Sequence, residues 1–319
     1  MHVTVAAWVA LVAGLVVLLL VDLFVLHRGA HAVSIRDAAW STGGFVAVAM
    51  AFGALLWVHE GQGVAGQFFA GYVLELSLSL DNVFVWALIF GAFAVPAAYQ
   101  HRVLFYGIFG ALVLRGAFVA VGAELLSAFG WVVYVFGALL LLSGLRMLRG
   151  TPPPDPEKNP VVRVVRRRLP TTRHIIGAHL FVRERGVAED QRPERAPLLR
   201  RWYATPMLAV LIVIETSDIL FAVDSIPAIF GVTREPFLVF SATALALVGL
   251  RSMYFLLAGA LDRFAYLHLG LAVILAFVGV KFLLTDVVHI GAGASLLVIV
   301  VVVAAAIGAS LLRPPRGAG

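Results

Sequence analysis

The feature that most constrains this chain is a series of nine apolar segments, each roughly 19 to 26 residues long and nearly free of charge. A helix of about 20 residues crosses the ~30 Å hydrocarbon core of a bilayer and satisfies its own backbone hydrogen bonds there. Hydrophobic residues make up 61% of the chain and charged residues only 13%. We therefore predict an all-α, polytopic membrane protein of about nine transmembrane helices. The expected segments lie near residues 4–26, 39–58, 68–94, 103–123, 128–148, 205–230, 236–258, 264–285 and 289–312.

The first segment has the length of a secretory signal but lacks its other features. Its start, M-H-V-T, is not basic, no small-residue cleavage site follows, and Asp22 interrupts the apolar run. We expect a retained helix in a multi-pass protein of the cell membrane.

The distribution of Lys and Arg predicts the orientation, because basic residues accumulate in cytoplasmic loops. Alternate connections carry them, while the other set of connections holds only Arg234. This pattern predicts an N-terminus outside and a cytoplasmic C-terminus, which requires an odd number of helices. The basic residues in question are Arg28, Arg36, Arg102, Arg263, Arg313 and Arg316.

The long connection 150–203 is rich in Pro and Arg, and it divides the chain. We expect five helices in 1–149, a cytoplasmic loop in 150–203 with a short strand or helix, four helices in 204–313, and a cytoplasmic tail in 314–319. The run Arg166, Arg167 and Arg168 favours contact with anionic lipid headgroups. No nucleic-acid partner is expected.

The chain contains no Cys, and it lacks a P-loop, a G-x-S-x-G motif and an H-E-x-x-H motif. Thiolate chemistry is excluded, and nothing points to an enzyme or to a bound cofactor. Function must come from polar groups within the membrane.

Six acidic residues interrupt the apolar segments, and each would cost about 2.5–3.5 kcal/mol if it lay unpaired at a helix centre. The same segments contain only three basic residues, Arg115, Arg251 and Lys281, which cannot neutralise six anions. We expect the acids to be functional. They are Asp22, Glu75, Asp81, Glu215, Asp218 and Asp224.

The two acid-rich segments resemble each other. Glu75 precedes Asp81-Asn82 by six residues, and Asp218 precedes Asp224-Ser225 by the same spacing; Arg115 and Arg251 follow one segment later in each unit. The units, segments 68–148 and 205–285, start three helices apart and would run in opposite directions. This predicts an inverted repeat with a binding site where the halves meet.

Helical periodicity predicts which of these side chains share a face. Glu75 and Asn82 lie on one stripe and Asp81 projects about 120° from Glu75. Glu215 and Asp218 share a face, whereas Asp224 points away from Glu215. Because Pro227 frees a backbone carbonyl, we expect the helix to be kinked or unwound at A-V-D-S-I-P, which would turn Asp224 inward.

Carboxylate, amide and hydroxyl oxygens are hard ligands that suit Mn²⁺, Ca²⁺ and Mg²⁺. No His or Met cluster accompanies the acids to favour zinc or copper.

The stretches E-L-S-L-S-L-D-N-V-F-V-W-A-L-I-F and E-T-S-D-I-L-F-A-V-D-S-I-P-A-I-F resemble the two signature helices of the TerC family of integral membrane proteins. The resemblance covers most of the chain and implies a transporter that exports a divalent metal ion, with manganese the best associated cargo. It places the family's acidic positions on the six acids named above.

We hypothesise that the metal, Mn²⁺ or alternatively Ca²⁺, binds between segments 68–94 and 205–230, with Asp81 and Asp224 as principal ligands. Glu75, Asp218, Asn82 and Ser225 would complete the site, and proton exchange is a compatible coupling because crowded carboxylates favour protonation. Arg115 and Arg251 are expected either to act as internal counter-ions of the empty site or to be fixed partners of carboxylates.

Two alternatives from other classes stay open. The acids would form a proton relay in a proton-translocating or pH-homeostasis protein, which would show flux without divalent ions. A membrane scaffold would instead act through the 150–203 loop and would tolerate changes to the acids.

The counter-ion role predicts that Arg251→Gln lowers metal affinity or allows leakage, because the empty site would lose its balancing charge. Metal binding and flux measured on reconstituted protein test this, and unchanged affinity with unchanged transport would contradict the role.

Overall fold

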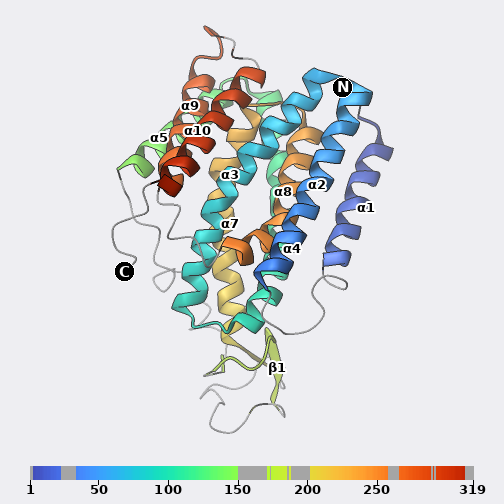
Figure 1. The fold of residues 1–319 in the computed structure, drawn as a ribbon, viewed down its shortest axis with the longest axis vertical. Helices are drawn as coiled ribbons and strands as arrows, with labels where there is room; N and C mark the ends of the chain where they lie inside the picture. Colours follow the sequence, from blue (N-terminus) through green and yellow to red (C-terminus); the bar gives the residue numbers. More distant parts are fainter. Residues whose placement is uncertain are drawn as a thin grey trace.

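The structure, a computed structural model, describes residues 3–22, 34–149, 171–172, 174–184, 187, 202–257, 266–288, 290 and 292–312. Within them, all nine expected segments are helices (Figure 1). The helices are α1 Val5–Val21, α2 Ile35–Glu60, α3 Gln62–Ala92, α4 Ala97–Ala128, α5 Val132–Leu148, α7 Pro206–Phe230, α8 Pro236–Leu257, α9 Leu267–Leu283 and α10 Ala292–Leu312.

Several helices begin earlier than their apolar segments, because caps and turns set the ends. The Ser34 hydroxyl accepts the Asp37 N–H at 3.1 Å and starts α2. Gly61, at φ 90°, ends α2 and precedes α3, a conformation that favours glycine. α3 and α4 each add a polar first turn that hydropathy does not detect.

Four helices, α2, α4, α7 and α8, are long and apolar enough to cross a membrane by length and composition. α1, α5 and the apolar parts of α9 and α10 are shorter, at 10–17 residues. The architecture is that of a multi-pass helical bundle.

The contacts between helices give their relative directions. The Thr233 hydroxyl, just after α7, donates to Gln67 near the start of α3 at 2.6 Å, so α3 and α7 run antiparallel. α4 runs parallel to α7, because Gly107 lies against Ile214 and Gly122 against Phe230. Since α3 likewise runs parallel to α8, the two halves contact each other in matching pairs, as an inverted repeat predicts.

The α5 and α9 helices cross at glycines that correspond in the two halves. A Cβ added at Gly144 would lie 2.7 Å from the Ala272 carbonyl oxygen. A Cβ added at Gly279 would lie 2.8 Å from the Gly137 carbonyl oxygen. S-G-L-R-M-L at the end of α5 and V-G-V-K-F-L at the end of α9 align on these glycines, which extends the repeat to its third helix. Close backbone approach at small residues is a common way for membrane helices to associate.

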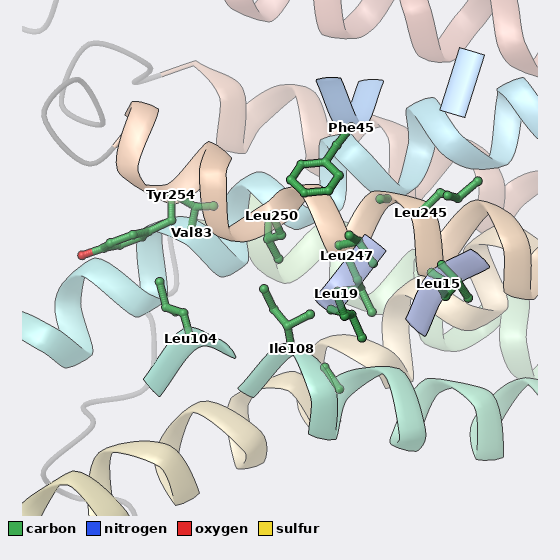
Figure 2. Packing of buried hydrophobic residues seen from close by; sticks show 14 of the residues in the cluster. Leu15, Leu19, Phe45, Val83, Leu104, Ile108, Leu245, Leu247, Leu250 and Tyr254 are labelled. Atoms are coloured by element: carbon green, nitrogen blue, oxygen red, sulfur yellow. The ribbon is translucent and has the colours of Figure 1, made fainter. Parts of the chain in front are cut away.

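Two apolar clusters hold the bundle together. The larger one joins α1, α2, α8 and the adjoining parts of α3, α4 and α7. Figure 2 shows it around α8, where Leu247 and Leu250 lie among Leu19, Phe45 and Ile108 from three other helices. The second cluster joins the first part of α3 and the ends of α4 and α7 to α5, α9 and α10.

A two-stranded antiparallel ribbon lies at the long connection before α7, where a short strand or helix is expected, and adds a small β element to the predicted all-α chain. β1 (Phe181–Arg183) pairs with β2 (Trp202–Ala204) in the register Val182 to Tyr203. The Thr205 N–H donates to the Leu180 carbonyl at 3.0 Å, which ties the ribbon to the start of α7. Figure 1 shows the ribbon projecting from one end of the bundle. The expected element around V-V-R-V-V, residues 161–165, lies outside the described residues.

The opposite end of the bundle, which we call the far end, receives the start of α1, because Trp8 packs edge-on against Phe237 at the start of α8. The end of α10 lies beside the start of α9, where Ser310 accepts the Tyr266 N–H at 3.0 Å. Gly231 at the end of α7 lies near Val278 of α9, so α9 ends at the far end and α10 returns toward the ribbon. These positions agree with an N-terminus and a C-terminus on opposite sides.

The glycine crossing gives a stability prediction. Gly144→Ala is expected to lower the free energy of unfolding by about 1–3 kcal/mol, because the added methyl group would overlap the backbone of α9. Thermal unfolding in detergent measures the change. Gly14→Ala on α1, where no atom lies within 4 Å, is the matched control and should be neutral or slightly stabilising. Equal midpoints for the two variants would contradict tight packing at the crossing.

Candidate functional site

The centre of the candidate site is Arg115 on α4, whose side chain is only 1% exposed. Its guanidinium forms an ion pair with Glu75 on α3 and contacts Asp218 on α7, where Nη2 lies 3.4 Å from Oδ1. Both carboxylates are buried as well. The arginine thus joins one acid from each half of the chain, and we call these three residues the buried triad.

The stripe expected on α3 is confirmed. Glu75, Ser79 and Asn82 are all buried, and the Ser79 hydroxyl and the Asn82 amide have no hydrogen-bond partner among the described residues. On α7, Ser225 lies two turns after Asp218. It is buried, and its hydroxyl also has no hydrogen-bond partner among the described residues. Hard oxygen donors therefore continue along both helices beyond the triad.

Glu215 shares the α4-facing side of α7 with Asp218, as periodicity predicted. Its carboxylate lies against Gly110, where any side chain on α4 would overlap it. Glu215 is half-buried, and its Oε2 has no hydrogen-bond partner among the described residues. Two acids of α7 thus approach α4 within one helical turn, and Arg115 contacts one of them, Asp218.

Asp22 and Arg251 form a separate pair. Asp22, at the end of α1, forms an ion pair with Arg251 of α8, and Arg251 also donates to the Asp22 carbonyl at 3.2 Å. The Arg251 guanidinium lies 5.9 Å from the Phe105 ring centroid on α4, a cation–π distance. The two arginines therefore differ: Arg115 joins the two halves, whereas Arg251 attaches α1.

Of the kinked or unwound helix expected at A-V-D-S-I-P, the unwound form is wrong. α7 continues as a helix through Pro227 to Phe230, because the proline lies within the last turn and is enclosed by buried neighbours. Asp224 therefore stays on the side opposite Glu215 and faces α5. Its Oδ1 accepts the Ser143 hydroxyl at 2.8 Å, and Arg146 acts on it electrostatically.

The predicted acids that the structure describes are thus distributed over four places: the buried triad, Glu215 beside Gly110, the Asp22–Arg251 pair, and Asp224 of α7, which faces α5. Asp81 lies in α3, but its side chain is outside the described atoms. Among the described residues, no group of three or more acidic, His or Cys side chains is arranged to hold a metal ion.

Sequence reasoning missed the partners Ser143, Arg146 and Gly110. Comparison of the third helices of the two halves could have directed attention to Ser143 and Arg146, since S-G-L-R-M-L matches V-G-V-K-F-L. Gly110 carries no such signal, because its role follows from which helix faces Glu215.

The bundle and its buried charges define a class: a multi-pass membrane protein in which two acid-bearing helices, α3 and α7, meet at a buried arginine. The family model of the TerC integral membrane proteins matches residues 60–317. The chain belongs to the TerC family.

Relatives of similar length support this assignment. A membrane protein of Myxococcus xanthus named STKORF319 is 42% identical over 307 residues, covering 96% of this chain and 92% of the relative. Alx of Escherichia coli (strain K12), named as a candidate membrane-bound redox modulator, is 43% identical over 92% of this chain and 90% of its own. The tellurium resistance protein TerC of Serratia marcescens is 37% identical over 98% of this chain and 94% of its own length. No solved structure matches the chain.

The buried triad predicts a large effect of removing its cation. Arg115→Met should lower the free energy of unfolding by about 3–5 kcal/mol, because two buried carboxylates lose their partner. Thermal unfolding in detergent is the measurement, with Arg102→Met at the exposed start of α4 as control.

The combined variant Glu75→Gln/Arg115→Met/Asp218→Asn should recover much of this loss, since no unpaired charge stays buried. A single Arg115→Met variant as stable as the wild type would show that the triad is not ionised.

Proposed function

We propose that this protein exports a divalent metal cation, with Mn²⁺ as the preferred cargo. The observation that carries the proposal is the buried triad, in which one arginine contacts an acid from each half of an inversely oriented pair. Such a triad supplies the negative charge that a cation needs and a positive charge that can hold the site together without cargo. Transporters built from inverted repeats place their ion sites at this interface.

In the proposed mechanism, Arg115 acts as the internal counter-ion. When a cation arrives, Glu75 and Asp218 exchange the guanidinium for the metal, and Ser79, Asn82 and Ser225 supply further oxygen ligands. Glu215 adds a third carboxylate one turn away from Asp218. The two acids with Arg115 leave one net negative charge, which favours entry of a cation into this low-dielectric site.

Access would alternate by movement of one half against the other. The antiparallel α3 and α7 meet at the triad, and the α5–α9 crossing holds the third helices of both halves together. Asp81 and Asp224 are the acids that the movement would bring toward the cargo. Asp224 leaves its Ser143 contact in that step, and protons released by the acids are the proposed exchange ion.

The proposed orientation has the N-terminus outside and the ribbon end in the cytoplasm. The basic residues of 150–203 would then contact anionic headgroups of the inner leaflet. This direction makes the cytoplasmic end the entry for the exported ion.

Manganese is proposed over calcium because the family that the signature segments resemble is best associated with it; the printed names of the relatives, a redox modulator and a tellurium resistance protein, identify no cargo. This chain contains no Cys, so thiol exchange within it would not explain a redox role. Oxygen ligands suit Mn²⁺ as well as the alkaline-earth ions.

Uptake of Mn²⁺, Ca²⁺, Mg²⁺ and Zn²⁺ into proteoliposomes tests the proposal. Mn²⁺ flux is expected for the wild type and a loss of at least about tenfold for Asp218→Asn, because a directly coordinating charge is removed. Asp81→Asn and Asp224→Asn test the two acids that are proposed to join during transport. Glu124→Gln, an exposed acid on α4, is the matched control and should transport normally.

Proton movement without metal flux would favour the proton relay. Normal flux in all acid variants, with function lost on deletion of 150–203, would favour the scaffold.

A further inference from the structure

A half-open cavity of about 340 Å³ lies at the far end of the bundle, away from the buried triad. It is lined by the end of α7 and the connection to α8, together with the last turn of α9 and Thr285. Thr233 also lines the cavity, but its hydroxyl already donates a hydrogen bond to Gln67. The cavity has room for a group several times larger than a water molecule.

Two cations from different elements line this cavity: Arg234 in the α7–α8 connection and Lys281 in the last turn of α9. In the part of the chain that the structure describes, neither has a salt bridge to a carboxylate. The acids that follow nearby are not lining residues: Asp286 accepts the Tyr134 hydroxyl, and Glu235 directs its backbone N–H at Thr233.

Lys281 is held in position. Its Nζ donates to the buried Ser295 hydroxyl of α10 at 2.8 Å, which leaves two of its three N–H groups for another acceptor. The side chain is half-buried in an otherwise apolar helix. A cation in such surroundings is stabilised by a nearby anion.

Along α3, the backbone at Asp81 lies far from the cavity. The hydrogen bond between Gln67 and Thr233 places the cavity at the level of Gln67 on α3. Asp81 follows fourteen residues later, which is about 21 Å along the helix. Arg115 and Arg251 each form an ion pair with an acid. Lys281 and Arg234 instead line the same cavity and give it a positive charge.

We propose that this cavity binds a phosphate-class oxyanion through Arg234 and Lys281, either as free phosphate or as the headgroup of an anionic phospholipid. Arginine offers a planar fork of donors for oxyanions, and lysine adds a point charge. Thr285 supplies a hydroxyl on the same wall. The position at the end of membrane helices admits both sources. The inference does not rest on the proposed metal transport.

The experiment uses the full-length protein, purified in detergent, delipidated and treated with chelator. Binding of inorganic phosphate is measured by calorimetry, and retention of phosphatidylglycerol by native mass spectrometry. Wild-type protein is expected to bind one of the two probes: phosphate alone identifies a free-anion site, and phosphatidylglycerol identifies a headgroup site.

Lys281→Gln and Arg234→Gln should each weaken that binding by about tenfold or more, because a charge-assisted hydrogen bond is lost. Lys281→Arg should retain most of it. Arg102→Gln, an exposed cation at the start of α4 near the ribbon end, is the matched control and should bind as the wild type does. Arg234 is exposed and lies outside the helices, so Arg234→Gln is expected to fold normally even if Lys281→Gln does not.

Failure of wild-type protein to bind either probe would overturn the proposal, as would unchanged binding in both Gln variants. Neither result would bear on Mn²⁺ flux, which depends on the triad.

Discussion

The interaction on which the rest of the structure depends is the neutralisation of buried acids by Arg115. Charges inside a membrane protein are tolerated when they are paired, and here one guanidinium meets Glu75 from the first half and Asp218 from the second. α3, α4 and α7 must therefore stay together at this level. The two apolar clusters and the close glycine crossing of α5 and α9 supply the packing around these ion contacts.

The two halves are similar in pattern but differ in the use of their arginines. Arg115 lies between the halves, whereas Arg251 pairs with Asp22 from α1, a helix outside the repeat. The α5–α9 crossing preserves the symmetry more closely, because glycines at corresponding positions approach the opposite backbone in the same way. A rigid crossing beside an exchangeable charged contact is a suitable arrangement for a site that opens alternately to two sides.

Much of this could be predicted from sequence. The nine apolar segments, the stripe of Glu75 and Asn82, and the shared face of Glu215 and Asp218 follow from length and helical periodicity, which are local properties. The unwinding at Pro227 was the main error: a proline near the end of a helix disturbs few hydrogen bonds, and buried neighbours keep the last turn helical. Ser143 as the partner of Asp224 could not be predicted, because that contact joins residues 81 positions apart.

The sequence by itself predicted a bundle of membrane helices, an inverse relation between its two halves, and acids on defined faces. Hydropathy, spacing and periodicity are properties of single helices or of pairs of equivalent helices, so they can be recognised without knowing the tertiary structure. Only the tertiary structure decided which acid meets which cation. That choice depends on helix directions, on small residues such as Gly110 that permit close approach, and on the packing that brings Arg234 and Lys281 to one cavity. These are long-range contacts, and no local pattern encodes them.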